Sequence, residues 1–275
     1  MTPITARIRR ALLYAVLVAG AFISVFPYLL VLLTAFKTQA QLSSTAPWLP
    51  GLPPTTDNLA TMLSGDFPRF ILNTAIMTAV LTAGQLVFTT FAAYAFARLR
   101  FRGRDVLFWL FVATMMVPSA VTMIPLFLIM RELDLVNTWY GLLIPYVLGT
   151  PYGIFLMRQF FKTLPAGLEE AARIDGAGPL TILLRVLLPL CRPALGTLAI
   201  ITIISSWNSF LWPLIITSGD ETKVITVAIA TLKDGIGVDY HLMMAGSLIA
   251  LAPMVVIFIF FQKYIVRSVV LTGLK

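Results

Sequence analysis

Charged residues are scarce in this sequence. Asp, Glu, Lys and Arg make up 12% of the 275 residues, whereas hydrophobic residues make up 59%. A soluble domain has about 25% charged residues, so this composition places the chain in a membrane. The length accommodates about six spans of roughly 20 residues each. The predicted fold class is therefore an all-α integral membrane protein with six transmembrane helices.

Other absences exclude whole classes of chemistry. The chain has one cysteine, Cys191, and one histidine, His241. A single cysteine cannot form an internal disulfide framework, and one histidine leaves no recognisable His/Cys metal cluster. The sequence G-x-x-x-x-G-K-[ST], which cradles nucleotide phosphates, does not occur. We therefore predict no catalytic site, no metal site and no bound cofactor in this chain.

The apolar runs predict where the spans lie. The first run, Ala11 to Phe36, exceeds the 7–15 apolar residues of a signal peptide core, which favours an uncleaved first span. Pro118 and Pro125 interrupt the third run, and Pro145 and Pro151 the fourth, which predicts kinks there. The prediction is one transmembrane domain over residues 1–275, with spans at about 11–36, 70–97, 106–130, 136–157, 194–217 and 241–265 and a cytoplasmic loop at 162–193.

The distribution of basic residues predicts the orientation. Of the 20 Lys and Arg residues, 15 fall in the termini and loops that this topology places inside, and five fall outside. Basic residues gather on the cytoplasmic side of membrane proteins, so both termini are predicted to be cytoplasmic. The same rule explains the net charge of +8 without nucleic-acid binding. Cys191 and His241 then lie on opposite sides, which excludes a Cys/His or Ser/His/Asp catalytic arrangement.

The apolar interiors of the spans contain uncharged polar residues but no ionisable ones. Intramembrane ionisable residues usually mark proton relays and ion-coupled carriers, so a stand-alone ion-coupled carrier is disfavoured, although sodium coupling through backbone oxygens stays open. Ser, Thr and Asn at these positions can serve as contacts between helices, or they can line a path for a neutral polar solute. Tryptophan could also belong to an interfacial belt. The candidate path residues are Asn73, Thr114, Ser119, Trp207, Asn208 and Trp212.

A polar stretch, Lys162 to Pro193, separates the fourth and fifth spans. Pro165 suits the first turn of a helix and Gly176 the residue just past its end, so residues 165–175 are predicted to form a short helix. Glu169 and Arg173 are spaced to pair on one face of it.

This stretch resembles the EAA signature of bacterial ABC-importer permeases, E-A-A-x3-G-x9-I-x-L-P, with Val186 in place of the Ile. The segments FARLRFRGR, MMVPSAVTMIPLF and WNSFLWPL are similar to the carbohydrate importers of the maltose-permease type, whereas the C-terminal tail VRSVVLTGLK departs from their pattern. The resemblance implies that residues 165–175 are a coupling helix docked on an ATPase subunit. The implied coupling residues are Glu169, Glu170, Ala171, Ala172, Arg173, Asp175, Gly176, Leu188 and Pro189.

The resemblance also implies a division of labour. A second homologous permease subunit would complete a heterodimer, two cytoplasmic ATPase subunits would bind ATP and Mg, and an external solute-binding protein would deliver the solute. The expected function is uptake of a sugar or sugar derivative by alternating access across a bacterial cell membrane. Alternatives are an importer for glycerol phosphate or a polyamine, a stand-alone carrier or channel, or a scaffold protein without a transport role.

Overall fold

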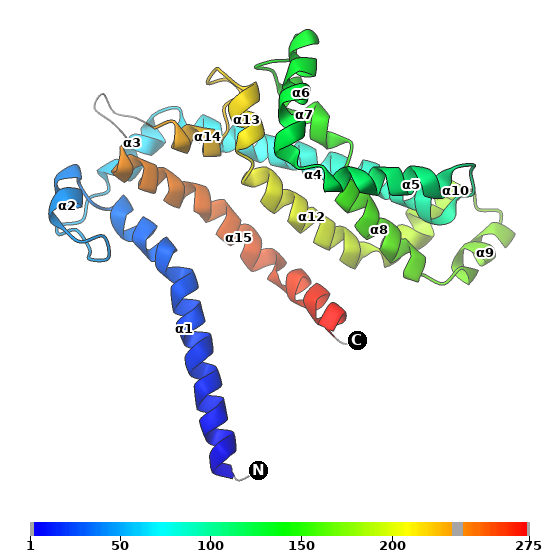
Figure 1. Ribbon diagram of the computed structural model, residues 1–275, viewed down its shortest axis with the longest axis horizontal. Coiled ribbons are helices and arrows are strands. Elements are labelled where there is room, and N and C mark those ends of the chain that lie inside the picture. Colours follow the sequence, from blue (N-terminus) through cyan, green and yellow to red (C-terminus); the bar gives the residue numbers. More distant parts are fainter. Residues whose placement is uncertain (1–2, 233–238, 274–275) are drawn as a thin grey trace. The chain divides into compact units, whose positions relative to one another are not determined.

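The computed structural model describes residues 3–232 and 239–273, and within these ranges the regular elements are all helices (Figure 1). The chain divides into two compact units. One contains Met1–Pro68 and Ala228–Pro253, and the other contains Arg69–Val227 and Met254–Lys275. Lys233 and Asp234, assigned to an outside loop, lie outside the described residues, as do the side chains of the C-terminal tail. The prediction of a single domain stays a prediction.

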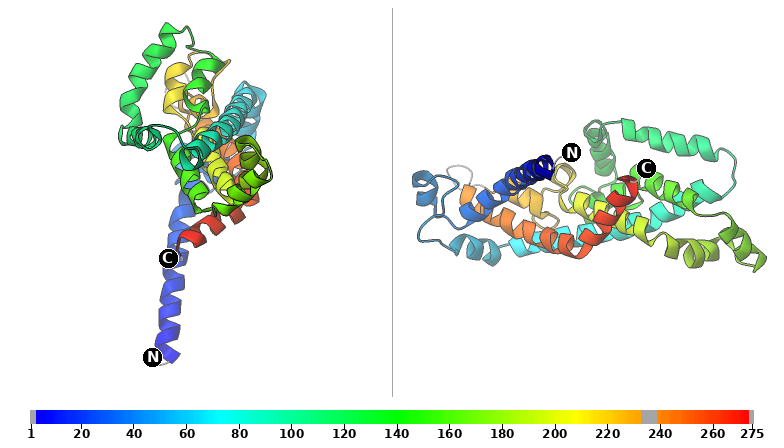
Figure 2. Two further views of the ribbon diagram at one scale, coloured as in Figure 1. Left: turned by 90° about the vertical axis from the view of Figure 1, so that its right-hand side faces the viewer. Right: turned by 90° about the horizontal axis from the view of Figure 1, so that it is seen from below.

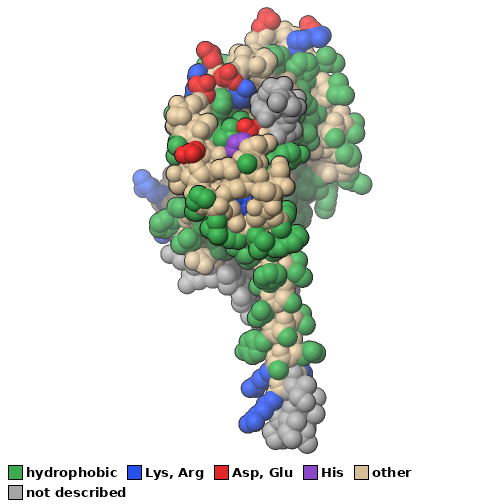
Figure 3. Space-filling view, turned by 90° about the vertical axis from the view of Figure 1, so that its left-hand side faces the viewer, with side chains coloured by type: hydrophobic (Ala, Val, Ile, Leu, Met, Phe, Trp, Pro, Cys, Tyr) green, Lys and Arg blue, Asp and Glu red, His purple; other side chains and the backbone are tan. Residues whose placement is uncertain are grey.

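The first unit begins with α1, Pro3–Ala35. Within Arg9–Ala35, an 18-residue window has a mean hydropathy of 2.5 and contains no buried residue. Figure 3 shows hydrophobic side chains around this helix and arginine side chains near its N-terminal end. A helix that is apolar all round belongs in lipid, and α1 therefore has the surface of a membrane span.

The segment 37–69, expected to be a loop, contains two short helices, α2 (Gln39–Ser44) and α3 (Asp57–Ser64). Thr38 and Gln41 form a reciprocal capping box at the start of α2. The buried amide of Asn58 donates to the carbonyls of Ala35 and Lys37, at 2.9 and 2.8 Å. Because Asn58 satisfies the carbonyls that α1 leaves free at its end, this segment is tied to the end of the first span. The last long helix, α15 (Tyr240–Gly273), also begins in this unit.

The second unit contains most of the remaining helices. Its long helix α4, Phe67–Arg98, begins at the boundary between the units. Figures 1 and 2 show α4, α8 and α12 running alongside one another. The other elements are α5 (Arg104–Ala113), the 3-10 turn η1 (Thr114–Met116), α6 (Ser119–Glu132), α7 (Trp139–Val147), α8 (Pro151–Thr163), α9 (Gly167–Ile174), α10 (Pro179–Thr181), the π-helical turn η2 (Ile182–Leu187), α11 (Leu188–Leu190), α12 (Arg192–Trp207) and α13 (Leu211–Ile216). A further short helix, α14 (Ile225–Ala230), lies in the predicted outside loop 218–240.

Among the described residues, four stretches are long and apolar enough to cross a membrane without a sharp bend, and two bent pairs raise the number to six. The third predicted span, in which prolines were expected to cause kinks, consists of α5–η1 and α6, which meet at 103°. Pro118 directly precedes α6, and the residue before it, Val117, is extended. A residue before proline is pushed out of the helical region by its ring, which explains why the helix breaks at this point.

The fifth span also differs from its predicted bounds of 194–217. Helix α12 ends at Trp207, and α13 is a separate helix. Asn208 caps α12, and its side-chain amide donates to the carbonyl of Ile204 at 2.8 Å. Such a local bond competes with continuation of the helix. At its other end, α12 is bent by 81° from the segment Pro179–Leu190.

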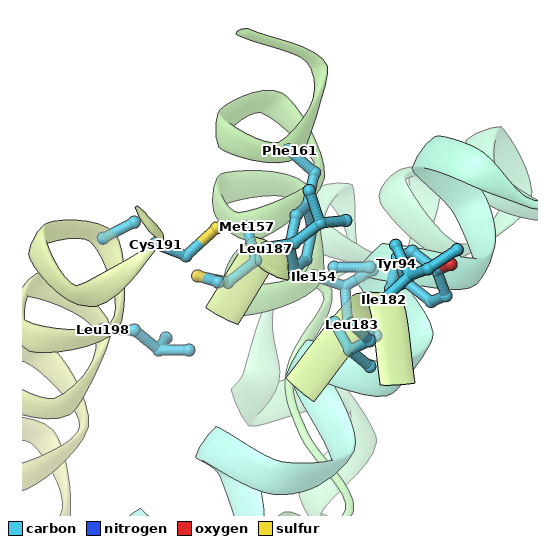
Figure 4. Close-up of a cluster of buried hydrophobic side chains, with 11 residues drawn as sticks. Tyr94, Ile154, Met157, Phe161, Ile182, Leu183, Leu187, Cys191 and Leu198 are labelled. Carbon is cyan, nitrogen blue, oxygen red and sulfur yellow. The ribbon is translucent and has the colours of Figure 1, made fainter. Parts of the chain in front are cut away.

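A hydrophobic core joins α8 to the second half of the polar stretch 162–193 (Figure 4). Met157 and Phe161 of α8 pack against Ile182, Leu183 and Leu187 of η2, and all five are essentially inaccessible. Burying such a side chain contributes roughly 1.5–3 kcal/mol. The polar stretch is therefore anchored by its second half and is not a free surface loop.

Candidate functional site

The first candidate site is the exposed helix α9. The predicted helix, residues 165–175, is confirmed over Gly167–Ile174, with Pro165 two residues before it. Gly176 has φ of +79°, and no other atom lies near the place that a Cβ would take. The next amide, Ala177 N–H, donates to Ala172 O at 2.9 Å. Glycine takes this left-handed conformation without steric cost. The sequence thus places the turn after α9 correctly.

The two adjacent glutamates of α9 differ in exposure. Glu169 is buried, with 5% of its surface exposed, whereas Glu170 is exposed. Glu169 pairs with Arg173, as its spacing predicts, at 3.4 Å from Arg173 Nη2 to Glu169 Oε2. It also pairs with Arg98, at the end of α4. Glu169 is therefore directed into the protein, and Glu170 is free to meet a partner.

The other predicted coupling residues also differ in exposure. Ala171, Arg173, Asp175 and Gly176 are exposed, and Ala172 is half-buried. In the second half of the stretch, Leu188 is half-buried and Pro189 is exposed. The exposed members form a surface on which α9 presents a carboxylate and small side chains, which permit close approach of another backbone.

The second candidate site is a cavity of about 570 Å³ within the second unit. Residues from α4, α6, α7, α8, α12 and α13 line it. The lining residues are Leu81, Gln85, Ser119, Met123, Tyr146, Thr150, Tyr152, Leu198, Ile201, Thr202, Ser205, Ser206, Asn208, Ser209, Phe210, Leu211 and Trp212. Its lining in the described chain includes hydroxyl, amide and aromatic groups but no Asp, Glu, Lys, Arg or His. Such a wall suits a neutral solute with both hydroxyl groups and apolar faces.

Gln85 forms hydrogen bonds to two other elements of the cavity wall. It is buried, its side-chain amide donates to Tyr146 O at 3.0 Å, and its side-chain oxygen accepts from the Thr202 hydroxyl at 3.3 Å. Trp212 donates from Nε1 to Gly141 O at 3.2 Å, and its ring meets Tyr146 edge-on at 6.0 Å between centroids. These bonds join α4, α7, α12 and α13 around the cavity.

The structure brings together half of the predicted path residues. Ser119, Asn208 and Trp212 line the cavity. Asn73 instead donates to the carbonyls of Glu221 and Lys223, both at 2.9 Å, and Thr114 donates to Phe111 O at 2.7 Å. Trp207 is buried outside the lining. Their place on the solute path stays a prediction.

Sequence reasoning left Gln85, Tyr146 and Thr202 out of the predicted path. Gln85 was visible as a polar residue within a span. However, its partners lie 61 and 117 positions away, and no local pattern reveals such contacts.

Comparison with known proteins distinguishes an importer permease from a stand-alone carrier and from a scaffold protein. Residues 85–271 match the family described as "Binding-protein-dependent transport system inner membrane component". The chain belongs to this family. It is thus an ABC-importer permease, a transport component of a membrane and not an enzyme.

Individual relatives agree with this assignment. The permease is 34% identical to an arabinooligosaccharides transport system permease protein of Halalkalibacterium halodurans, over 93% of this chain and 92% of the relative. It is 35% identical to an sn-glycerol-3-phosphate transport system permease protein of Yersinia pestis, over 75% and 74% of the two chains. Its fold matches the crystal structure of a bacterial ABC transporter that imports alginate, with a TM-score of 0.85, 26% identity, and coverage of 96% of this chain and 99% of that one.

Proposed function

We propose that this permease takes up a neutral sugar or sugar derivative by alternating access. The observation that carries the proposal is the cavity, whose described lining offers hydroxyl, amide and aromatic groups without a charge. Relatives named for arabinooligosaccharides and for the acidic polysaccharide alginate support a carbohydrate. That the sugar is neutral rests on the uncharged cavity lining alone. A relative named for sn-glycerol-3-phosphate keeps that phosphate ester as the second candidate.

We further propose that α9 is the coupling helix. Glu170 is exposed on it, Ala171 offers a small contact surface, and Gly176 turns the chain away through its positive φ. An exposed carboxylate can form a directional, charge-assisted pair with a basic residue of an ATPase subunit. The complex would comprise a second homologous permease, two ATPase subunits that bind ATP and Mg, and an external solute-binding protein.

The coupling role is tested with Glu170→Ala and Gly176→Pro in the reconstituted complex. Proline cannot adopt the φ of +79° found at Gly176, and alanine removes the carboxylate. Both variants should lose solute uptake and solute-stimulated ATP hydrolysis. Glu132→Ala, at an exposed glutamate on α6, is the matched control. Normal uptake and normal stimulation in both α9 variants would contradict the proposal.

The substrate class is tested by competition. Uptake of a radiolabelled neutral oligosaccharide by the complex should be inhibited by neutral sugars and not by sn-glycerol-3-phosphate. The reverse pattern would favour the phosphate ester. A second measurement uses Asn208→Leu, which replaces an amide of the cavity lining and should raise the half-saturating solute concentration. An unchanged uptake curve would remove this cavity from the proposed path.

We propose that both termini are cytoplasmic, on the basis of the 15 to 5 division of basic residues. The single native cysteine, Cys191, is fully buried. A thiol introduced at the exposed position Ser44 should therefore react with a membrane-impermeant maleimide on intact cells. One introduced at the exposed position Thr163 should react only after the cells are opened. The opposite pattern would reverse the orientation.

A further inference from the structure

Arg98, the last residue of α4, contacts two other elements. Its Nη2 donates to the carbonyls of Phe161 and Leu164, at 2.5 and 2.6 Å, where α8 ends. Its Nε lies 3.0 Å from Glu169 Oε1, on α9. One guanidinium therefore connects the end of α4, the end of α8 and the proposed coupling helix. The contact from Nε to Glu169 is an ion pair without hydrogen-bond geometry, whereas Nη2 makes both hydrogen bonds to the carbonyls.

Solvent is largely excluded from this contact. The side chains of Arg98 and Glu169 are 12% and 6% exposed. An exposed ion pair contributes little and breaks easily. By contrast, removing one partner of a buried pair leaves an uncompensated buried charge, which is strongly unfavourable. Glu169 is thus held to Arg98, and α9 cannot move away from α4 without breaking the contact.

The same helix reaches the cavity. Gln85, which bonds to Tyr146 and Thr202 across the cavity wall, lies on α4 13 residues before Arg98. At 1.5 Å per residue, this corresponds to about 20 Å of helix. A continuous helix is a rigid connection, and coupling between distant sites requires such a physical link.

We infer that Arg98 is a positioning residue that transmits movement of α9 to α4 and so to the cavity wall. The inference rests on the proposed coupling role of α9. It gives the adjacent glutamates different tasks: Glu170 meets the ATPase subunit, and Glu169 passes the displacement to Arg98. The Arg98–Glu169 pair is then needed for using the energy of ATP, not for docking the ATPase subunit.

The experiment compares Arg98→Met, Glu169→Gln and the double variant in proteoliposomes that contain the whole complex. Methionine keeps an unbranched side chain without the charge, and glutamine keeps the shape of Glu169. The measured quantity is solute taken up per ATP hydrolysed. It should fall roughly fivefold or more, the size of a typical coupling between sites, while the ATPase subunits still co-purify. The double variant should fall less than the product of the two single effects, because both changes remove the Arg98–Glu169 contact. Arg98→Met also removes the bonds to the Phe161 and Leu164 carbonyls, and Glu169→Gln also removes the charge that pairs with Arg173.

Arg100→Met is the matched control, since Arg100 is exposed in the same turn. Three results would overturn the inference: an unchanged ratio in both single variants, an equal fall in the control, or effects that multiply in the double variant. If Arg98→Met does not assemble, Glu169→Gln decides alone. A defect in Glu170→Ala with normal ratios in the Arg98 and Glu169 variants would refute this inference only. Normal behaviour of all of them would refute the coupling role of α9 as well.

Discussion

Replacing Arg158 by methionine should destabilise the second unit. Arg158 lies on α8 with 4% of its surface exposed. Its Nε donates to Phe96 O at 3.1 Å, its Nη2 lies 3.2 Å from Asp105 Oδ1, and its guanidinium carbon sits 3.7 Å from the centre of the Phe108 ring. One side chain therefore joins α8 to the end of α4 and to the start of α5.

The size of the effect follows from these three contacts. A hydrogen bond from a charged group contributes about 1.5–3 kcal/mol, and a desolvated cation–π contact contributes up to about 2 kcal/mol. The Asp105 side chain is 59% exposed, so water can solvate it after the change and its ion pair adds little. Methionine preserves much of the packing of the stem. We expect a loss of about 3 kcal/mol, and at roughly 2–4 °C per kcal/mol a fall in Tm of roughly 6–12 °C.

The assay is thermal unfolding of the detergent-solubilised permease, with Asp105→Asn and Arg100→Met measured alongside. Asp105→Asn should lower Tm only slightly, because the Asp105 carboxylate is solvated, and Arg100→Met, at an exposed position, should have an effect within about 0.5 kcal/mol of zero. A fall in Tm for Arg158→Met no larger than that for Asp105→Asn would refute the reasoning. It would show that the carbonyl and ring contacts contribute nothing.

Three further predictions concern single positions. Asn58→Asp keeps the shape but removes the donors to two backbone carbonyls, and a loss of roughly 3 kcal/mol should be measurable as a lower Tm. Gly141→Ala would place Cβ 2.1 Å from Leu135 O, so α7 must shift, and a comparable fall in Tm is expected. A hydrogen bond from Lys223, together with its charge, holds the pKa of the Asp220 carboxyl below its usual range. The contact stabilises the fold above the unfolded-state pKa and is lost as pH falls through the lower folded-state pKa, so Asp220→Asn should flatten the dependence of Tm on pH between about 5 and 2.

Local sequence signals predicted the elements that depend on local physics. Apolar runs predicted long apolar helices, which lipid requires, and α1, α4 and α15 are such helices. Gly176 marked the end of α9 because glycine tolerates a positive φ, and the order of Glu169 and Arg173 predicted their pairing. Prolines were informative but ambiguous. Pro118 stands at a break between helices, whereas Pro125 lies inside one.

Contacts between distant residues could not be predicted in this way. Arg98 was interpreted as one of several arginines that fix the topology, yet it bonds to residues more than 60 positions away. Asn73 was assigned to a solute path, and its side-chain amide donates to backbone carbonyls about 150 positions further along the chain. In both cases the residue type indicates a strong hydrogen-bonding group, but only the fold determines its partner.

The cavity suggests how the permease shares its task with other subunits. The side-chain amide and oxygen of Gln85 and the Nε1 of Trp212 form hydrogen bonds within the protein. These bonds hold the wall in place, and the bonded atoms are not offered to a solute. A solute that enters such a path must also leave it, and binding that is too strong would stop transport. A wall without charge, in which the polar atoms of Gln85 and Trp212 are already bonded within the protein, therefore suits passage better than capture. In a binding-protein-dependent system, selective capture can then be performed by the external protein, while the roles proposed for this chain are a neutral, polar route and the mechanical connection that opens it.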